Sequence, residues 1–211
     1  MVAETTSFDA RAETWDEDPM KTARAEAVAA AMRAGARWQP GMHGLEFGCG
    51  TGLLSFALRD RFDAIVMADT SAGMLDVLRR KIARTDAVGL EPRLLDAGAG
   101  GLADTLAGER VDMIFSLMTL HHVPDTDGIL AQFAEALPVG GQLCIADLDA
   151  EDGSFHAHDP SVHNGFDRGA LERRLVAAGF GAVRFSTVFS IAKGTPARDY
   201  PVFLMIAEKI A

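Results

Sequence analysis

Apolar residues along this chain fall into short continuous runs that alternate with longer amphipathic segments. The short runs predict buried strands, because their apolar residues are unbroken rather than alternating. The amphipathic segments predict helices, because their apolar residues share one helical face. Strands are expected at 44–47, 64–68, 92–95, 111–115 and 142–146, and helices at 20–34, 53–61, 72–83, 125–137 and 168–178. This alternation is typical of right-handed crossovers and a parallel sheet with helices on both faces.

The end of the chain departs from this alternation. Residues 183–191 and 202–210 both have the pattern of strands, and only a loop separates them. Consecutive strands that are joined without a helix favour an antiparallel hairpin. We therefore expect a doubly wound α/β fold in which this hairpin closes a mostly parallel sheet. The longest segments without a clear pattern are 1–18 and 148–167, and loops of this size are often lids or binding loops.

The composition indicates one folded domain over residues 1–211. Hydrophobic residues make up 48% of the chain and charged residues 24%, as in ordinary globular proteins. No apolar run approaches the roughly 20 residues that cross a bilayer, and the polar, acidic start is unlike a signal peptide. The two cysteines, Cys49 and Cys144, argue against a disulfide framework or a cysteine-based zinc site. We expect a cytoplasmic protein without a membrane partner.

The charge balance bears on the class of partner. The formal net charge at pH 7 is −10, and no run of basic residues stands out. Proteins that bind nucleic acids use lysine and arginine to neutralise phosphates. The sequence therefore predicts no nucleic-acid partner, and it does not indicate the oligomeric state.

Three glycines at alternate positions follow the first expected strand. They are Gly48, Gly50 and Gly52, within Leu-Glu-Phe-Gly-Cys-Gly-Thr-Gly at 45–52. Glycine has no Cβ, so it adopts positive φ and lets a ligand lie against the backbone. The dinucleotide fingerprint G-x-G-x-x-G requires a glycine at the position of Leu53. The loop therefore favours a nucleoside-like cofactor that lacks a pyrophosphate.

Acidic residues lie at or near the ends of the first three expected strands, at the edge where open α/β sheets bind ligands. They are Glu46, Asp69 and Asp96. The spacing from Glu46 to Asp69 is close to the roughly 20 residues expected for a carboxylate that binds a ribose diol. Glu46 is suited to a cationic amine, and Asp96 with Ala97 to an adenine amino group. Met74 is placed to pack on a purine. Together these residues predict a ligand with a purine, a diol and a positive charge.

The ordered set of motifs resembles the class I S-adenosylmethionine-dependent methyltransferases. The resemblance covers residues 40–150 well and the rest loosely. Its motifs are the glycine loop at 45–52, the acidic strand end at 67–71, and the motifs of the third strand at 95–97, the fourth strand at 115–125 and the lead into the fifth strand at 137–141. The chain departs from the commonest pattern at Glu46, where aspartate is usual, and in the glycine-rich segment 98–108.

The resemblance implies a Rossmann-like sheet of seven strands, the last of them antiparallel, with S-adenosylmethionine as the cofactor. In the family, the glycine loop holds the methionyl part, the residue at Asp69 binds the ribose hydroxyls, and the residue at Asp96 lies near the adenine. The expected cofactor-binding residues are Glu46, Gly48, Cys49, Gly50, Gly52, Asp69, Thr70, Met74, Asp96, Ala97 and Leu117. Residues 1–38 are expected to form an N-terminal arm and helix. In similar enzymes the arm folds over the cofactor, so Trp15 either covers the cofactor or serves only as a hydrophobic anchor.

His121 and His122 follow the fourth expected strand, where a substrate approaches the methyl group. Either histidine is a candidate catalytic base or a residue that orients the substrate. The alternative is a loop in which a histidine only packs. Methyl transfer from a sulfonium is an in-line displacement that depends largely on positioning, so it does not require a dedicated base.

The segment 148–167 has the composition of a metal-binding cluster, with His156, His158, Asp159 and His163. Their spacing matches no zinc pattern, and no cysteine assists them. We therefore expect no metal here, and interpret the segment as a polar loop over the substrate pocket.

The residues favour S-adenosylmethionine-dependent methyl transfer to a small-molecule acceptor. A non-catalytic protein that binds the same cofactor stays open, because binding residues and activity are separate questions. An NAD-dependent oxidoreductase is disfavoured by the missing third glycine, and because Tyr200 lacks the lysine four residues on that short-chain dehydrogenases have. Nucleic-acid methylation is disfavoured because residues 116–119 lack a Pro-Pro-aromatic signature and the chain has no Pro-Cys pair. The acceptor atom is not indicated.

Overall fold

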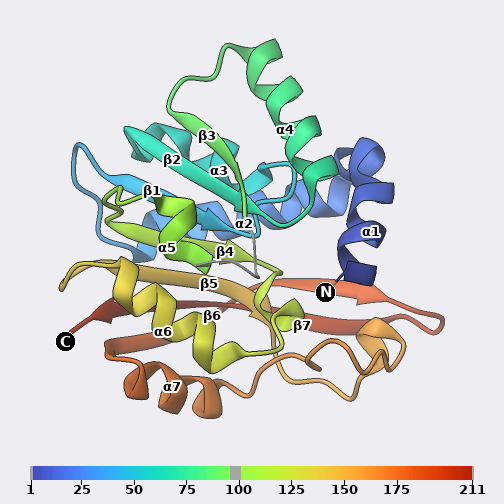
Figure 1. The fold of residues 1–211 in the computed structure, drawn as a ribbon. Coiled ribbons are helices and arrows are strands. Elements are labelled where there is room, and N and C mark those ends of the chain that lie inside the picture. Colours follow the sequence, from blue (N-terminus) through green and yellow to red (C-terminus); the bar gives the residue numbers. More distant parts are fainter. Residues whose placement is uncertain (1, 96–100, 211) are drawn as a thin grey trace.

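The computed structural model describes residues 2–95 and 101–210, and its strands alternate with helices (Figure 1). The α-helices are α1 (Val2–Arg11), α2 (Pro19–Gly35), α3 (Leu53–Leu58), α4 (Ala72–Thr85), α5 (Gly101–Leu106), α6 (Thr126–Ala136) and α7 (Arg168–Ala177). The short 3-10 helices are η1 (Ala12–Glu17), η2 (Arg59–Arg61), η3 (Leu120–His122) and η4 (Ser154–His156). The strands are β1 (His43–Phe47), β2 (Ala64–Asp69), β3 (Leu90–Leu94), β4 (Met113–Leu117), β5 (Gln142–Leu148), β6 (Phe180–Lys193) and β7 (Arg198–Lys209). Among the helices that the structure describes, none has the length and apolar character needed to cross a bilayer.

Within the described residues, seven strands form one sheet in the order β3-β2-β1-β4-β5-β7-β6 (Figure 1). Neighbouring strands from β3 through β5 pair in parallel. Strand β7 pairs antiparallel with both β5 and β6, and therefore lies between them. The predicted mostly parallel sheet with an antiparallel last strand is confirmed. The strand order reverses between β1 and β4, and ligands in such sheets bind beyond the carboxyl ends of the strands at this point.

Side chains of the strands β2, β4, β5 and β7 alternate between two apolar cores, one on each face of the sheet. On β2, Ile65 and Met67 belong to one core, whereas Val66 and Ala68 belong to the other. The core of Ile65 includes apolar side chains of α2, α3 and α4, and the core of Val66 includes those of α5, α6 and α7. Helices therefore cover both faces, as the continuous apolar runs of the strands predict.

Several helices begin where a short polar side chain accepts a hydrogen bond from the first turn. The capping residues are Asp18 for α2, Ser71 for α4, Asp125 for α6 and Asp167 for α7. Such a cap stabilises a helix by about 1 kcal/mol. Helix α2 also has Pro19 at its first position, where a missing N–H costs nothing. These signals explain why the starts of the four helices agree with the sequence prediction to within one residue.

Other element boundaries differ from the prediction. Segment 1–18, expected to be irregular, contains α1 and η1, and α5 is absent from the prediction. The expected helix 53–61 ends its α-helical part at Leu58 and continues as the 3-10 helix η2. Strands β3 and β4 are shifted by about two residues from their expected ranges, because pairing with neighbours sets their ends. In β4, Met113 pairs with Gly44 on one side and Gln142 on the other.

Candidate functional site

The turn from β1 to α3 is held against the carboxyl end of β2 by main-chain hydrogen bonds. The N–H groups of Gly48 and Cys49 both donate to the carbonyl oxygen of Ala68, at 2.8 and 3.0 Å. The next N–H, that of Gly50, donates to the carboxylate of Asp69 at 2.7 Å. All three glycines of the loop have positive φ, between +53° and +80°. Glycine adopts this region without strain, so the alternate glycines allow a tight loop between the ends of β1 and β2.

The loop glycines differ in what surrounds them. A Cβ at Gly48 would lie 2.2–2.7 Å from three side-chain atoms of Thr119, so the absence of a side chain there is a packing requirement. A Cβ at Gly50 would come no nearer than 3.9 Å to Trp15 and 4.0 Å to Met74. A group placed against the main chain of Gly50 would therefore make only ordinary contacts, with Trp15 and Met74, and would meet no clash.

Asp69, at the end of β2, is half-buried and faces the glycine loop. Its Oδ1 accepts from the N–H of Ser71 at 2.8 Å, and its Oδ2 accepts from the N–H of Gly50. Burial raises the pKa of Asp69, and these N–H groups oppose that rise. A carboxylate has about four acceptor positions. Asp69 therefore holds the loop in place and retains capacity to accept hydrogen bonds from ligand hydroxyls.

Glu46 is a buried carboxyl group close to the end of β1. It is 2% exposed, and its Oε2 accepts from the Ser55 N–H at 3.1 Å and from the Ser55 hydroxyl. Burial raises the pKa of Glu46 to about 8, the bonds from Ser55 oppose this rise, and the nearby charge of Asp69 adds to it. Glu46 is therefore mostly protonated at neutral pH, and a cation beside it favours the ionised form.

The N-terminal arm, made of α1 and η1, closes over the glycine loop and the start of α4. Asp9 accepts a hydrogen bond from the hydroxyl of Ser71. Asp16 accepts from the hydroxyl of Thr51 and from the ammonium group of Lys81. In Figure 1, α1 stands beside α4, with which it is in contact. The arm is therefore attached both to the glycine loop, through Thr51, and to the start of α4, through Ser71.

His121 and His122 lie in η3, directly after β4. His121 is 1% exposed, and its Nδ1 lies 2.7 Å from Oδ1 of Asp147 near the end of β5. Burial opposes ionisation of Asp147, but the neighbouring His121 and its hydrogen bonds hold the pKa of Asp147 below its usual value. The ionised Asp147 accepts a hydrogen bond from the N–H group at Nδ1 of His121. This bond favours the tautomer in which Nε2 of His121 carries the free lone pair.

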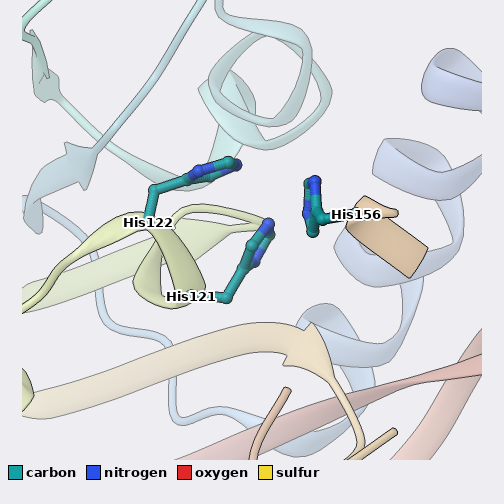
Figure 2. Close-up of side chains that lie close together, drawn as sticks. All are labelled: His121, His122 and His156. Carbon is teal, nitrogen blue, oxygen red and sulfur yellow. The ribbon is translucent and has the colours of Figure 1, made fainter. Parts of the chain in front are cut away.

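The segment 148–167 folds back onto η3. The N–H of His163 donates to the carbonyl oxygen of His121 at 2.8 Å. The ring centroid of His156, in η4, lies 5.0 Å from that of His121 and 5.2 Å from that of His122 (Figure 2). Burial, together with these two histidines, lowers the pKa of His156 to about 4, so the ring is neutral at pH 7.

The structure brings most of the residues expected from sequence to one edge of the sheet. These are Glu46, Gly48, Cys49, Gly50, Gly52, Asp69, Thr70, Met74, Leu117, His121 and His122. Asp96 and Ala97 lie outside the described residues. Sequence reasoning did not include Asp9, Asp147 or His156 in this group. Only Asp147 carries a local signal, its place near the end of the fifth strand.

A shallow hollow lies at the opposite edge of the sheet, where β1, β4 and β5 begin. Arg37, Asp112 and Gln142 are among the residues that line it. Because ligands of open α/β sheets bind beyond the carboxyl ends of the strands, we assign no role to this hollow.

Comparisons with known sequences match this chain to methyltransferases. A family model described as a methyltransferase domain matches residues 45–145. The ubiquinone biosynthesis O-methyltransferase of Chelativorans sp. is 34% identical over 109 residues, which are 52% of this chain and 41% of that protein. The chain spans about two fifths of the length of the curated relatives that it matches first, between 37% and 43%.

Solved structures share the fold across most of the chain. A chain from the complex between the Haloferax volcanii Trm112 methyltransferase activator and a methyltransferase superposes with a TM-score of 0.74 and 20% identity, covering 97% of this chain and 98% of that one. Phosphoethanolamine N-methyltransferase 2 of Haemonchus contortus, solved with S-adenosyl-L-methionine, superposes with a TM-score of 0.68 and 15% identity, covering 88% of this chain and 52% of that one. At these identities the likeness concerns the fold.

Alanine at Gly48 is expected to destabilise the protein more than alanine at Gly50. Both positions have positive φ, which costs an L-residue about 1–2 kcal/mol, but only the Gly48 Cβ collides with a neighbour, Thr119. Overpacking adds about 1–3 kcal/mol. Urea unfolding followed by circular dichroism measures both losses. Gly108→Ala is the control for the backbone cost, because Gly108 has φ of +82° and nothing within 4 Å of its Cβ position. Equal losses at Gly48 and Gly50 would contradict the packing role of Gly48.

The free energy of unfolding is expected to fall as pH rises from 5 to 8. The substitution Glu46→Gln should remove the part of this fall that Glu46 causes. Because burial raises the pKa of Glu46 to about 8 from 4.5, the folded state binds the proton more tightly than the unfolded state between these values. Stability from this group is therefore present below about pH 4.5 and is lost as pH rises to about 8, by at most about 1.4 kcal/mol per pH unit.

Urea unfolding at several pH values between 5 and 8 measures this effect. The stability of Glu46→Gln relative to the natural chain should increase steadily over the range. Glu26→Gln, at an exposed position of α2, is the matched control for the amide substitution. A stability difference for Glu46→Gln that is constant from pH 5 to pH 8 would show that Glu46 does not keep its proton in the fold.

Proposed function

We propose that this chain, which resembles methyltransferase domains over residues 45–145, is a class I S-adenosylmethionine-dependent methyltransferase that transfers a methyl group to a small-molecule acceptor. The observation that carries this proposal is the main chain of Gly50, which has no side chain, donates its N–H to the carboxylate of Asp69, and would have only ordinary contacts, with Trp15 and Met74, at a Cβ position. Such a surface suits a ligand that has a nucleoside and no diphosphate.

Residues at the ends of β1 and β2 suit separate parts of this cofactor. Asp69 suits the ribose hydroxyls, because a charged acceptor contributes about 1.5–3 kcal/mol per hydrogen bond. The buried acid Glu46 suits the α-amino group, because a cation favours its ionised form. The main chain of Gly50 lets the methionyl part approach. The remaining residues of the proposed cofactor site are Gly48, Cys49, Gly52, Thr70, Met74, Asp96, Ala97 and Leu117.

We place the acceptor beside η3, beneath the segment 148–167. S-adenosylmethionine bound at the glycine loop supplies an electrophilic methyl group: a lone pair of the acceptor bonds to the methyl carbon while the carbon–sulfur bond breaks and its electrons stay on sulfur. The contribution of the chain is to position the acceptor in line and exclude water. In this proposal His121 and His122 orient the acceptor or accept its proton.

A small acceptor agrees with how this space is enclosed. The ring of Phe8, in the arm, packs edge-on against His122 at a centroid distance of 5.3 Å, and the segment 148–167 is bonded to His121 through His163. The net charge of −10 disfavours a nucleic-acid acceptor. We also infer a reducing, cytoplasmic setting, which suits the two cysteines because both are buried and free.

Replacing Asp69 by alanine should weaken the affinity for S-adenosylhomocysteine tenfold to a hundredfold. The change removes hydrogen bonds to a charged acceptor, worth about 1.5–3 kcal/mol. Titration calorimetry measures the affinity, and circular dichroism checks the fold. Asp63→Ala is the matched control, because Asp63 is an exposed aspartate at the opposite end of β2. Unchanged affinity in Asp69→Ala would remove Asp69 from the site, and binding of NAD in place of the sulfur compounds would overturn the proposed class.

Methyl transfer is tested with S-adenosylmethionine labelled in its methyl group. The protein is incubated with a cell extract that has been separated into small molecules, proteins and nucleic acids. We expect label in the small-molecule fraction, and much less with Asp69→Ala at limiting cofactor. Label in proteins or nucleic acids would contradict the small acceptor. Tight cofactor binding with no transfer to any fraction would favour the non-catalytic alternative.

A further inference from the structure

Three imidazole rings from two distant segments converge on the acceptor side of the site. His121 and His122 come from η3, and His156 comes from η4. One nitrogen of each ring lies within 4.8 Å of a nitrogen of the others. Figure 2 shows the three side chains extending toward a common space. None of the cofactor-binding residues proposed above belongs to this cluster.

We propose that His121, His122 and His156 bind a divalent transition-metal ion of the Zn²⁺ type. This differs from the expectation of no metal in 148–167, because two of the three ligands come from η3, outside that segment. Imidazole nitrogens suit zinc and its neighbours in the periodic table, whereas Mg²⁺ and Ca²⁺ prefer oxygen ligands. Three protein ligands leave a fourth tetrahedral position open, as in catalytic rather than structural zinc sites.

The surroundings of His121 match those of a metal ligand. Its Nδ1 is bonded to the buried carboxylate of Asp147 at 2.7 Å, so that Nε2 carries the lone pair. A histidine that ligates a metal almost always donates its other ring N–H to a carboxylate, a carbonyl or water, which orients the ring and raises its basicity. Asp147 also accepts from the main-chain N–H groups of His121 and Leu148, which fix the carboxylate in turn. Its charge offsets part of the charge of a bound cation.

His156 supplies the second independent observation. Its Nε2 is shielded from solvent and has no hydrogen-bond partner among the described residues. A buried polar atom without a partner costs free energy in a folded protein, and a bound ion is one explanation of such an atom. The ring is close to both other histidines, at centroid distances of 5.0 and 5.2 Å.

The separation of the nitrogens requires only a small adjustment on binding. Zinc–nitrogen bonds of about 2.0–2.1 Å in a tetrahedral site place two ligand nitrogens about 3.4 Å apart. The nitrogens of the cluster are up to 4.8 Å apart. Neither His122 nor His156 is fully buried, so rotation of these two side chains toward the fixed ring of His121 closes the difference.

The open position of the ion gives it a role in the reaction, and this step rests on the proposed function. With the ion bound, His121 and His122 orient the acceptor through the ion and do not accept its proton. An oxygen or sulfur atom of the acceptor binds the ion, and its proton leaves to water because the ion lowers the pKa of that O–H or S–H group. The same atom then attacks the methyl carbon through a remaining lone pair. The cluster would therefore select acceptors that have a metal-binding heteroatom.

Metal binding is tested on the untagged full chain after dialysis against a chelator. Titration calorimetry with Zn²⁺ should give one ion per chain, and Co²⁺ should give the visible absorption of a four-coordinate site. His156→Ala should weaken Zn²⁺ binding at least about tenfold, because the loss of a residue that only supports a metal ligand already lowers metal affinity by about that factor. Asp147→Asn should weaken it less, through the orientation of His121. His158→Asn is the matched control, because His158 is exposed in the same loop and asparagine tolerates its φ of +60°.

The results separate this inference from the proposed function. Failure of the natural chain to bind Zn²⁺, or equal binding by His156→Ala, would overturn the metal site even where S-adenosylhomocysteine still binds. Zinc binding without any affinity for S-adenosylhomocysteine would instead overturn the cofactor assignment and leave the metal site standing. Circular dichroism of His156→Ala checks the fold, and His122→Ala is the second variant if that one fails to fold.

Discussion

The site depends on the hydrogen bonds that hold the glycine loop to the carboxyl end of β2. Three consecutive N–H groups, those of Gly48, Cys49 and Gly50, donate to the last two residues of that strand. These bonds fix where α3 begins, and they bring Asp69 beside the loop at the point where the strand order reverses. A loop of ordinary residues cannot make the same contacts, because Thr119 fills the space of a Gly48 side chain.

The edge of the sheet is an environment that a cation stabilises. The carboxyl groups of Glu46, Asp69 and Asp147 lie near the ends of β1, β2 and β5, and among the described residues none of them forms a salt bridge to lysine or arginine. Burial raises the pKa of Glu46 and of Asp69. A positively charged ligand relieves this cost of burial. A sulfonium cofactor with an α-amino group, and a metal ion at the histidine cluster, add positive charge beside these carboxyl groups, on which Lys81 and Arg24 act without forming a salt bridge to them in the described part of the chain.

Short sequence patterns predicted two kinds of element: helices that begin at a capping side chain, and strands that are buried on both faces. Continuous apolar runs indicated the parallel strands, and the capping residues Asp18, Ser71, Asp125 and Asp167 marked the starts of their helices. Helix α1 escaped prediction because contacts with α4, such as the bond from Ser71 to Asp9, hold it in place. The ends of β3 and β4 escaped because pairing with neighbouring strands decides them.

By itself, the sequence determined the fold class, the glycine loop and the carboxylates Glu46 and Asp69. Each was predicted from patterns of residues close together in the chain, because the spacing of such residues determines which of them share a strand, a turn or a helical face. Only the tertiary structure decided which side chains from distant segments meet. It placed His156 against His121 and His122, set Asp147 behind His121, and laid Trp15 over Gly50. No spacing rule reveals such contacts, because they arise when the sheet aligns its strand ends and the connecting segments fold back over them.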